Sequence, residues 1–172
     1  MPSFKITAPD AALHPVLQEK IDNKTKPLGA LGQLEKLALQ IGLVQQTLTP
    51  ALKRPALLIF AADHGLAREG VSAYPQAVTA QMVLNFLRGG AAANVFSRQH
   101  GFVLKVVDAG VDAEFPEAPA LITASLERGT ASSLQGPAMS LAQAELALQR
   151  GADIARAEIA AGSNVLAFGE MG

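Results

Sequence analysis

Three predicted strands end in an acidic residue beside glycine, and these acids are the first candidates for chemistry. They are Asp63 in "ADHG", Asp108 in "VDAG" and Glu170 in "GEMG". The carboxyl ends of parallel strands share one edge of an open α/β sheet, and ligands bind in the crevice there. We therefore expect the three acids to face one site. Glu170 is the strongest isolated candidate, because a carboxylate that ends a buried strand beside a flexible glycine needs a functional reason to be there.

The pair Asp63 and His64 has two interpretations that the sequence leaves open. Histidine changes charge near neutral pH, so the pair is able to supply acid-base chemistry or contact a ligand. Alternatively, both side chains hydrogen-bond the following loop and hold the strand end in shape. A metal site is not expected, because the chain has only three histidines, none paired at ligand spacing, and no cysteine. No cofactor is expected either.

Composition indicates a folded chain and argues against several classes of partner. Hydrophobic residues make up 49% and charged residues 17%, which excludes the disordered class. The formal net charge is -1 and no basic patch is visible, so nucleic acid is not an expected partner. The apolar run "ALLIFAA" has about a third of the roughly 20 residues that a membrane-spanning helix needs. With no signal-like N-terminus and no cysteine, we expect a cytoplasmic protein without membrane contact.

Residues 1–50 are predicted to be helical. Asp10 is placed to cap a helix in "AALHPVLQEKID", and Pro15 implies that its regular part begins late. A second helix is expected in "LGQLEKLALQIGLVQQTL", where apolar residues at seven-residue spacing would form one stripe. Pro50 ends this segment.

Residues 51–172 alternate between predicted strands and helices. Strands are expected in "PALLIFAADHG", "FVLKVVDAGV", "ALITASL" and "NVLAFGEMG". Helices are expected in "PQAVTAQMVLNFLRGG" and "AAANVFSRQHG", and from Ser140, whose spacing to Gln143 is that of a capping box. This order predicts an α/β fold with an open, right-handed parallel sheet and flanking helices.

Seven stretches in the same order give the chain a specific resemblance to one family. They are "KPLGALGQLE", "FAADHG", "EGVSAYP", "VTAQMVLNFLRGGAAANV", "DAGVDA", "GPAMS" and "GEMG". Together they resemble the nicotinate-nucleotide:dimethylbenzimidazole phosphoribosyltransferase family of cobalamin synthesis. The resemblance implies a Rossmann-like sheet in residues 51–172, with residues 1–50 belonging to a small helical domain. It also implies a homodimer.

The activity implied by the resemblance is a pentosyl transfer. Family members move phosphoribose from nicotinate mononucleotide to 5,6-dimethylbenzimidazole, giving α-ribazole 5'-phosphate and nicotinate with inversion at the anomeric carbon. By position, Tyr74 and Met82 would border the base pocket, with Phe86 behind them. Taken alone, Met82 and Phe86 are typical core residues, since they share one face of a predicted helix.

The stretch Gly169 to Gly172 would, by the same resemblance, approach the ribose and phosphate. Glu170 would face the sugar, where a fixed carboxylate stabilises the positive charge that develops as nicotinate leaves. Met171 and the two glycines would contact the substrate beside it.

Two departures from the family qualify the expected activity. Ala30 stands where the family usually has serine, which we expect to be a structural change. Family members also continue beyond "GEMG" with a phosphate-binding loop and the glutamate that acts as general base. We therefore expect the front half of an enzyme, incomplete in the 51–172 domain and inactive alone. The alternatives are a non-catalytic base-binding or scaffolding subunit that needs a complementary C-terminal portion, and a fold relic without a ligand.

Overall fold

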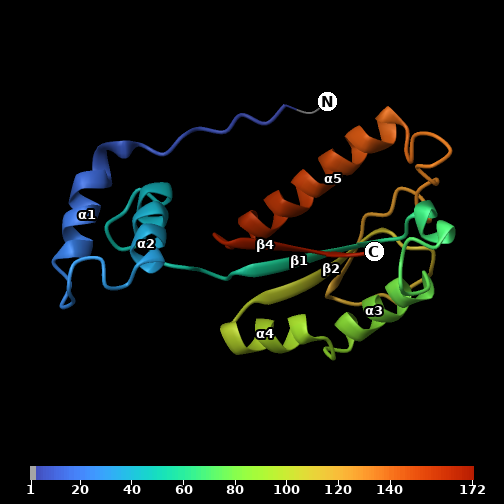
Figure 1. The fold of residues 1–172 in the computed structure, drawn as a ribbon, viewed down its shortest axis with the longest axis horizontal. Helices are drawn as coiled ribbons and strands as arrows, with labels where there is room; N and C mark the ends of the chain where they lie inside the picture. Colours follow the sequence, from blue (N-terminus) through green and yellow to red (C-terminus); the bar gives the residue numbers. More distant parts are fainter. Residues whose placement is uncertain (1–2) are drawn as a thin grey trace. The chain divides into compact units, whose positions relative to one another are not determined.

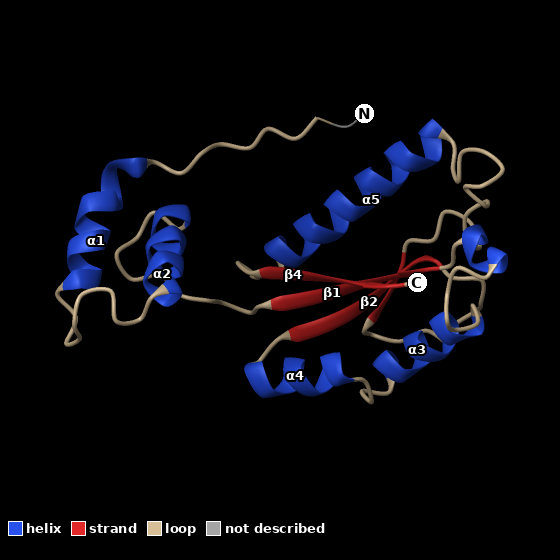
Figure 2. Cartoon of the chain, viewed as in Figure 1, coloured by secondary structure: helices blue, strands red, loops and turns tan. Residues whose placement is uncertain are grey.

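The computed structural model describes residues 3–172, which form two compact units, 3–52 and 53–172. The first unit contains a short 3-10 helix and two α-helices, namely η1 (Ala11–Leu13), α1 (His14–Asp22) and α2 (Gln33–Val44). The second contains β1 (Ala56–Ala62), η2 (Gly65–Glu69), α3 (Ala77–Leu87), α4 (Ala92–His100), β2 (Val103–Gly110), β3 (Leu121–Thr123), α5 (Leu141–Ala160) and β4 (Leu166–Met171). Figure 2 shows the strands of the second unit as one sheet with helices around it.

The sheet of the second unit is open and parallel, with the strand order β3-β2-β1-β4. Helices α3 and α4 cover one face and α5 lies on the other (Figure 1). The α/β class with a parallel sheet and flanking helices is thereby confirmed. Since β4 pairs only with β1 among the described strands, its outer edge is unpaired.

The main core lies between the sheet and helices α3 and α4. β1 is an apolar run because helices cover both of its faces, and Ile59 points into this core. The buried residues of α3 are Thr79, Val83 and Phe86, and Met82 is only partly buried against them. The buried face of α3 is therefore centred on Val83, whereas the sequence pattern had placed Met82 and Phe86 together on one face.

Helix α5 is fixed at its start and along its length. Ser140 Oγ accepts from Gln143 N at 3.2 Å, and Gln143 Oε1 accepts from Ser140 N at 2.7 Å, which confirms the predicted capping box. Further along the helix, Arg150 donates to the carbonyl oxygens of Ala124 and Ser125 at 2.9 and 2.6 Å. These bonds hold the loop after β3 against α5.

The helical unit packs differently from the expected stripe. Leu17 of α1 is buried, and its side chain lies against Gly42 of α2, where a Cβ would approach Leu17 Cδ2 to 2.7 Å. Leu31 and Leu34, which belong to the predicted stripe, are exposed instead. The helix contact depends on the small size of residue 42, which heptad spacing of larger residues does not reveal.

Candidate functional site

The three acids near the strand ends do lie along one edge of the sheet, but two of them hold loops. Asp108 is buried, and its Oδ1 accepts from the backbone N-H groups of Gly110 and Val111 at 3.0 and 2.9 Å. These bonds shape the turn after β2. The Asp108 carboxylate is therefore engaged by its own loop.

Asp63 has a similar structural position at the end of β1. Its side chain is 4% exposed, and Oδ2 accepts from the backbone N-H of Asp112 at 2.7 Å. Its backbone N-H donates to Gly110 O at 3.0 Å, and its carbonyl accepts from Thr130 N at 3.1 Å. These contacts favour the loop-holding interpretation for Asp63.

Glu170 differs from the other two acids because its side chain is exposed. It lies in β4 opposite Phe60 of β1, and on the same side of the strand as Phe168. Among residues 3–172, no side chain or backbone group forms a hydrogen bond or ion pair with its carboxylate. The carboxylate is thus available to a ligand at the carboxyl end of the sheet.

His64, Glu170 and the end of β1 converge on Gly172. A Cβ placed on Gly172 would lie 2.8 Å from Ala62 O, 2.8 Å from Glu170 Oε1 and 2.8 Å from His64 Nε2. A side chain at position 172 would have to displace these groups, because 2.8 Å is shorter than real Cβ contacts. Glycine at this position therefore lets the imidazole and the carboxylate approach each other.

A cavity of about 120 Å³ opens beside this convergence, and we call it the Tyr74 pocket. It is lined by Asp63, His64, Ala67, Ser72, Tyr74, Pro75, Gln76, Val78, Thr79, Met171 and Gly172. Its lining is mostly apolar, and Tyr74 is 73% exposed at its border. The pocket is smaller than the roughly 300 Å³ at which small-molecule sites begin, so these residues form only part of the walls of such a site.

The structure brings together five of the predicted site residues in this lining and separates the others. Asp63, His64, Tyr74, Met171 and Gly172 line the pocket, and Glu170 Oε1 lies 2.8 Å from the Cβ position of Gly172.

The remaining predicted residues pack elsewhere. Met82 and Phe86 pack in the core and are absent from the pocket lining. Gly169 lies against Ile59 in the sheet, where a Cβ would approach Ile59 Cγ1 to 3.3 Å.

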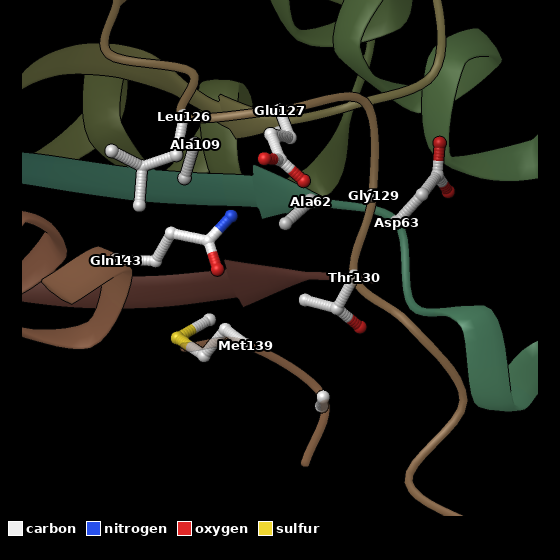
Figure 3. A pocket seen from close by; sticks show the side chains of 11 residues that line it. Ala62, Asp63, Ala109, Leu126, Glu127, Gly129, Thr130, Met139 and Gln143 are labelled. Carbon is white, nitrogen blue, oxygen red and sulfur yellow. The ribbon is translucent and has the colours of Figure 1, made fainter. Parts of the chain in front are cut away.

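A second cavity lies next to Asp63, over the ends of β1 and β2 (Figure 3). Its volume is about 40 Å³, and Glu127, Met139 and Gln143 are among the residues that line it. A cavity of this size holds at most a few water molecules. It is too small for an aromatic base, so the Tyr74 pocket is the better candidate for a substrate.

The part of the chain described here offers no preformed metal site. Within residues 3–172, no three histidine or acidic side chains gather closely enough to hold a metal ion. In the same range, no helix combines the length and apolarity needed to cross a membrane.

Several residues of the pocket escaped the sequence analysis. Outside the pocket lining, Thr130 holds the strand end next to His64, and no motif of the sequence pointed to it. Ser72, Gln76 and Thr79 line the pocket with Tyr74. The signal that would have found them is their position in the stretches that carry the family resemblance. Ser72 and Gln76 lie within or just after "EGVSAYP", and Thr79 lies in "VTAQMVLNFLRGGAAANV".

Comparison with known proteins agrees with this fold. A family model described as phosphoribosyltransferase matches residues 6–172. The chain therefore belongs to this phosphoribosyltransferase family. It is 59% identical, over its whole length, to the nicotinate-nucleotide-dimethylbenzimidazole phosphoribosyltransferase of Dechloromonas aromatica, of which it covers 49%. It is 57% identical, over 95% of its length, to the protein of the same name from Cupriavidus taiwanensis, of which it covers 47%.

Solved structures show the same relationship. The crystal structure of a nicotinate-nucleotide-dimethylbenzimidazole phosphoribosyltransferase from Thermus thermophilus superposes with a TM-score of 0.90 at 47% identity. The superposition covers 95% of this chain and 49% of that one. The family predicted from the seven stretches is confirmed. The chain spans about half the length of the curated relatives that it matches.

Proposed function

We propose that this chain contributes the N-terminal half of an enzyme that transfers phosphoribose from nicotinate mononucleotide to 5,6-dimethylbenzimidazole. The products are α-ribazole 5'-phosphate and nicotinate, a step in the synthesis of the cobalamin lower ligand. The names of relatives at 59% and 57% identity support the reaction, and membership of the family supports pentosyl transfer. We further propose a cytoplasmic homodimer as the working form.

The observation that carries the proposal is the position of the Glu170 carboxylate. It is exposed and unpaired at the carboxyl end of β4, next to Gly172, which lines the Tyr74 pocket. A flat aromatic ring suits an apolar pocket bordered by Tyr74 and Met171, while the sugar attached to it would extend past Gly172. Gly169, on the strand itself, leaves room for close packing there. Met82 and Phe86 would support the pocket from behind.

Glu170 is proposed to stabilise the transition state. As the bond from the anomeric carbon to nicotinate breaks, its electron pair goes to the pyridine nitrogen and positive charge develops on the ribose. A carboxylate held in place beside the sugar stabilises that charge without having to reorganise. The attacking benzimidazole nitrogen forms the new bond on the opposite face, which gives inversion.

The other benzimidazole nitrogen carries a proton that must leave. A general base close to that nitrogen has to accept it. We assign this base, and the groups that bind the phosphate, to the half of the relatives' length that this chain does not span. Catalysis is accordingly expected from this chain together with that second half.

A complementation assay tests the proposal. The chain is incubated with nicotinate mononucleotide and dimethylbenzimidazole, alone and with a polypeptide corresponding to the second half of the Dechloromonas aromatica relative. Chromatography then measures α-ribazole 5'-phosphate. We expect product from the pair, none from either half, and a loss of about a hundredfold for Glu170→Gln in the pair. Product from the chain alone would refute the shared site, and an inactive pair would refute the reaction.

A second candidate function is a non-catalytic subunit that binds an aromatic base and docks on another polypeptide. The unpaired outer edge of β4 favours it, because an exposed edge strand accepts pairing with another chain. Phe168 on this strand is 63% exposed, and its ring contacts only that of Phe60, at a centroid distance of 6.4 Å, among aromatic rings of the described chain. Saturable binding of dimethylbenzimidazole without product in any mixture would favour this function.

A further inference from the structure

The backbone around His64 is fixed from both sides, although its side chain is exposed. Thr130 accepts from Gly65 N at 3.0 Å and donates its own N-H to Asp63 O at 3.1 Å, so that residues 63–65 are bound to the following loop. Gly65 packs so tightly on that loop that a Cβ would lie 2.6 Å from Thr130 O. The chain therefore fixes the backbone that carries the imidazole and leaves the side chain exposed.

The imidazole is held next to Glu170 at a separation that one ligand atom can bridge. One point, the Cβ position of Gly172, lies 2.8 Å from both His64 Nε2 and Glu170 Oε1. By geometry, a ring of points around the line joining these two atoms has the same two distances. Gly172 Cα and Ala62 O adjoin one point of that ring, so a shared ligand atom would take another point on it. An oxygen atom placed there would be at ideal hydrogen-bonding distance from both groups.

We propose that His64 binds substrate, and that its Nε2 and Glu170 Oε1 together hold one hydroxyl group of the ribose. The inference rests on the proposed function and adds a second residue to its sugar site. The hydroxyl donates a hydrogen bond to the carboxylate and accepts a hydrogen bond from the imidazole N-H. Each bond thus has a donor and an acceptor.

The neighbouring charge selects a hydroxyl over the other groups of the substrate. A phosphate or a nicotinate carboxylate only accepts hydrogen bonds at neutral pH, and would be repelled by the Glu170 carboxylate at this distance. The aromatic base matches the apolar lining around Val78 and Met171 better than it matches this polar pair. Among the groups of nicotinate mononucleotide, a ribose hydroxyl is the one that both donates and accepts hydrogen bonds at neutral pH.

NMR of the histidine rings tests the inference on the chain as it exists. The chain has three histidines, so His14 and His100 serve as internal controls in the same spectra. Ribose 5-phosphate, nicotinate and nicotinate mononucleotide are titrated separately to millimolar concentration, while backbone amides of β1 and β4 report binding at the site. We expect ribose 5-phosphate and the mononucleotide to shift the His64 ring, and nicotinate to leave it unchanged.

Variants measure what the His64 contact contributes. His64→Ala is expected to weaken binding of ribose 5-phosphate about tenfold, because it removes a hydrogen bond to a polar ligand. His64→Gln keeps a donor and should recover much of the affinity, whereas His100→Ala should bind as the parent does. Recovery by glutamine distinguishes binding from a structural role, and unchanged amide spectra confirm that the variants are folded.

Two further results separate this inference from the proposed function. If the strand amides shift with the mononucleotide while the His64 ring stays in place, and His64→Ala binds normally, the inference fails and the proposed function stands. If nicotinate alone shifts the His64 ring, the imidazole contacts the base side and the inference is also wrong. If no ligand shifts the strand amides or the His64 ring, the inference fails, while the proposed function is decided separately by the complementation assay.

Discussion

The buried carboxylate of Glu158 provides the most quantitative prediction. It lies on α5 with 2% of its surface exposed, accepts from Arg54 Nη1 at 2.8 Å and pairs with Lys105 of β2. Burial raises the pKa of this carboxyl, but the hydrogen bonds from Lys105 and Arg54 outweigh burial and hold the pKa below its ordinary value. Glu158→Gln keeps the shape and removes the charge.

The size of the effect follows from the two ion pairs. A hydrogen bond to a charged group contributes about 1.5–3 kcal/mol. The side chains of Arg54 and Lys105 are 34% and 26% exposed, so water partly solvates the cations that lose their partner. We therefore take the lower end for both and expect Glu158→Gln to cost about 3 kcal/mol of the free energy of unfolding. In a chain of this size, that lowers Tm by roughly 6–12 °C.

Urea unfolding followed by circular dichroism, at several pH values, measures this cost. The control is Asp153→Asn on the same helix, whose ion pair with Arg156 is exposed and should contribute less than about 1 kcal/mol. Because the folded pKa of Glu158 is depressed, its stabilisation is complete above the ordinary glutamate pKa and is lost as pH falls through the folded pKa. A cost no larger than that of the control, or one that persists unchanged at acid pH, would refute this reasoning.

Three further substitutions test the packing that positions the site, each by urea unfolding. Gly65→Ala should destabilise the fold by about 2 kcal/mol, because its Cβ would lie 2.6 Å from backbone atoms of residues 131–132, and a neutral effect would contradict this tight contact. Gly151→Ala should stabilise by about 0.5–1 kcal/mol, because it lies inside α5 where a Cβ meets no atom within 4 Å; destabilisation would show hidden crowding. Ser140→Ala should cost about 1 kcal/mol by breaking the capping box with Gln143, and no cost would mean that the cap does not stabilise α5.

The fold was largely predictable because its local patterns agree with one another. β1 is a short apolar run between polar turns, and helices at least nine residues long separate it from β2 and precede β4. This alternation of strands and helices is typical of an open parallel sheet with flanking helices. The packing of the helical unit was not predictable in the same way. It depends on Leu17 meeting Gly42, a contact between two helices that neither helix pattern contains.

The site was predictable in location and less so in the role of each residue. Asp63, Asp108 and Glu170 have the same sequence signature, an acid near glycine at a strand end. The first two are bound by loop N-H groups, one of them 49 residues away in the chain, and such distant bonds leave no local pattern. Which acid stays available therefore depends on the loops. The approach of His64 and Glu170 to Gly172 likewise depends on how β4 is aligned with β1, which no local sequence pattern shows.

Binding of nicotinate mononucleotide to the chain, measured by titration calorimetry, tests the central claim most directly. The comparison is between the parent, Glu170→Gln and the control Glu117→Gln, an exposed glutamate just before β3 at the opposite edge of the sheet. We predict saturable binding by the parent and the control, and binding weakened about tenfold or more in Glu170→Gln. Saturable binding with equal affinity for all three proteins would contradict the assignment of the sugar site to Glu170.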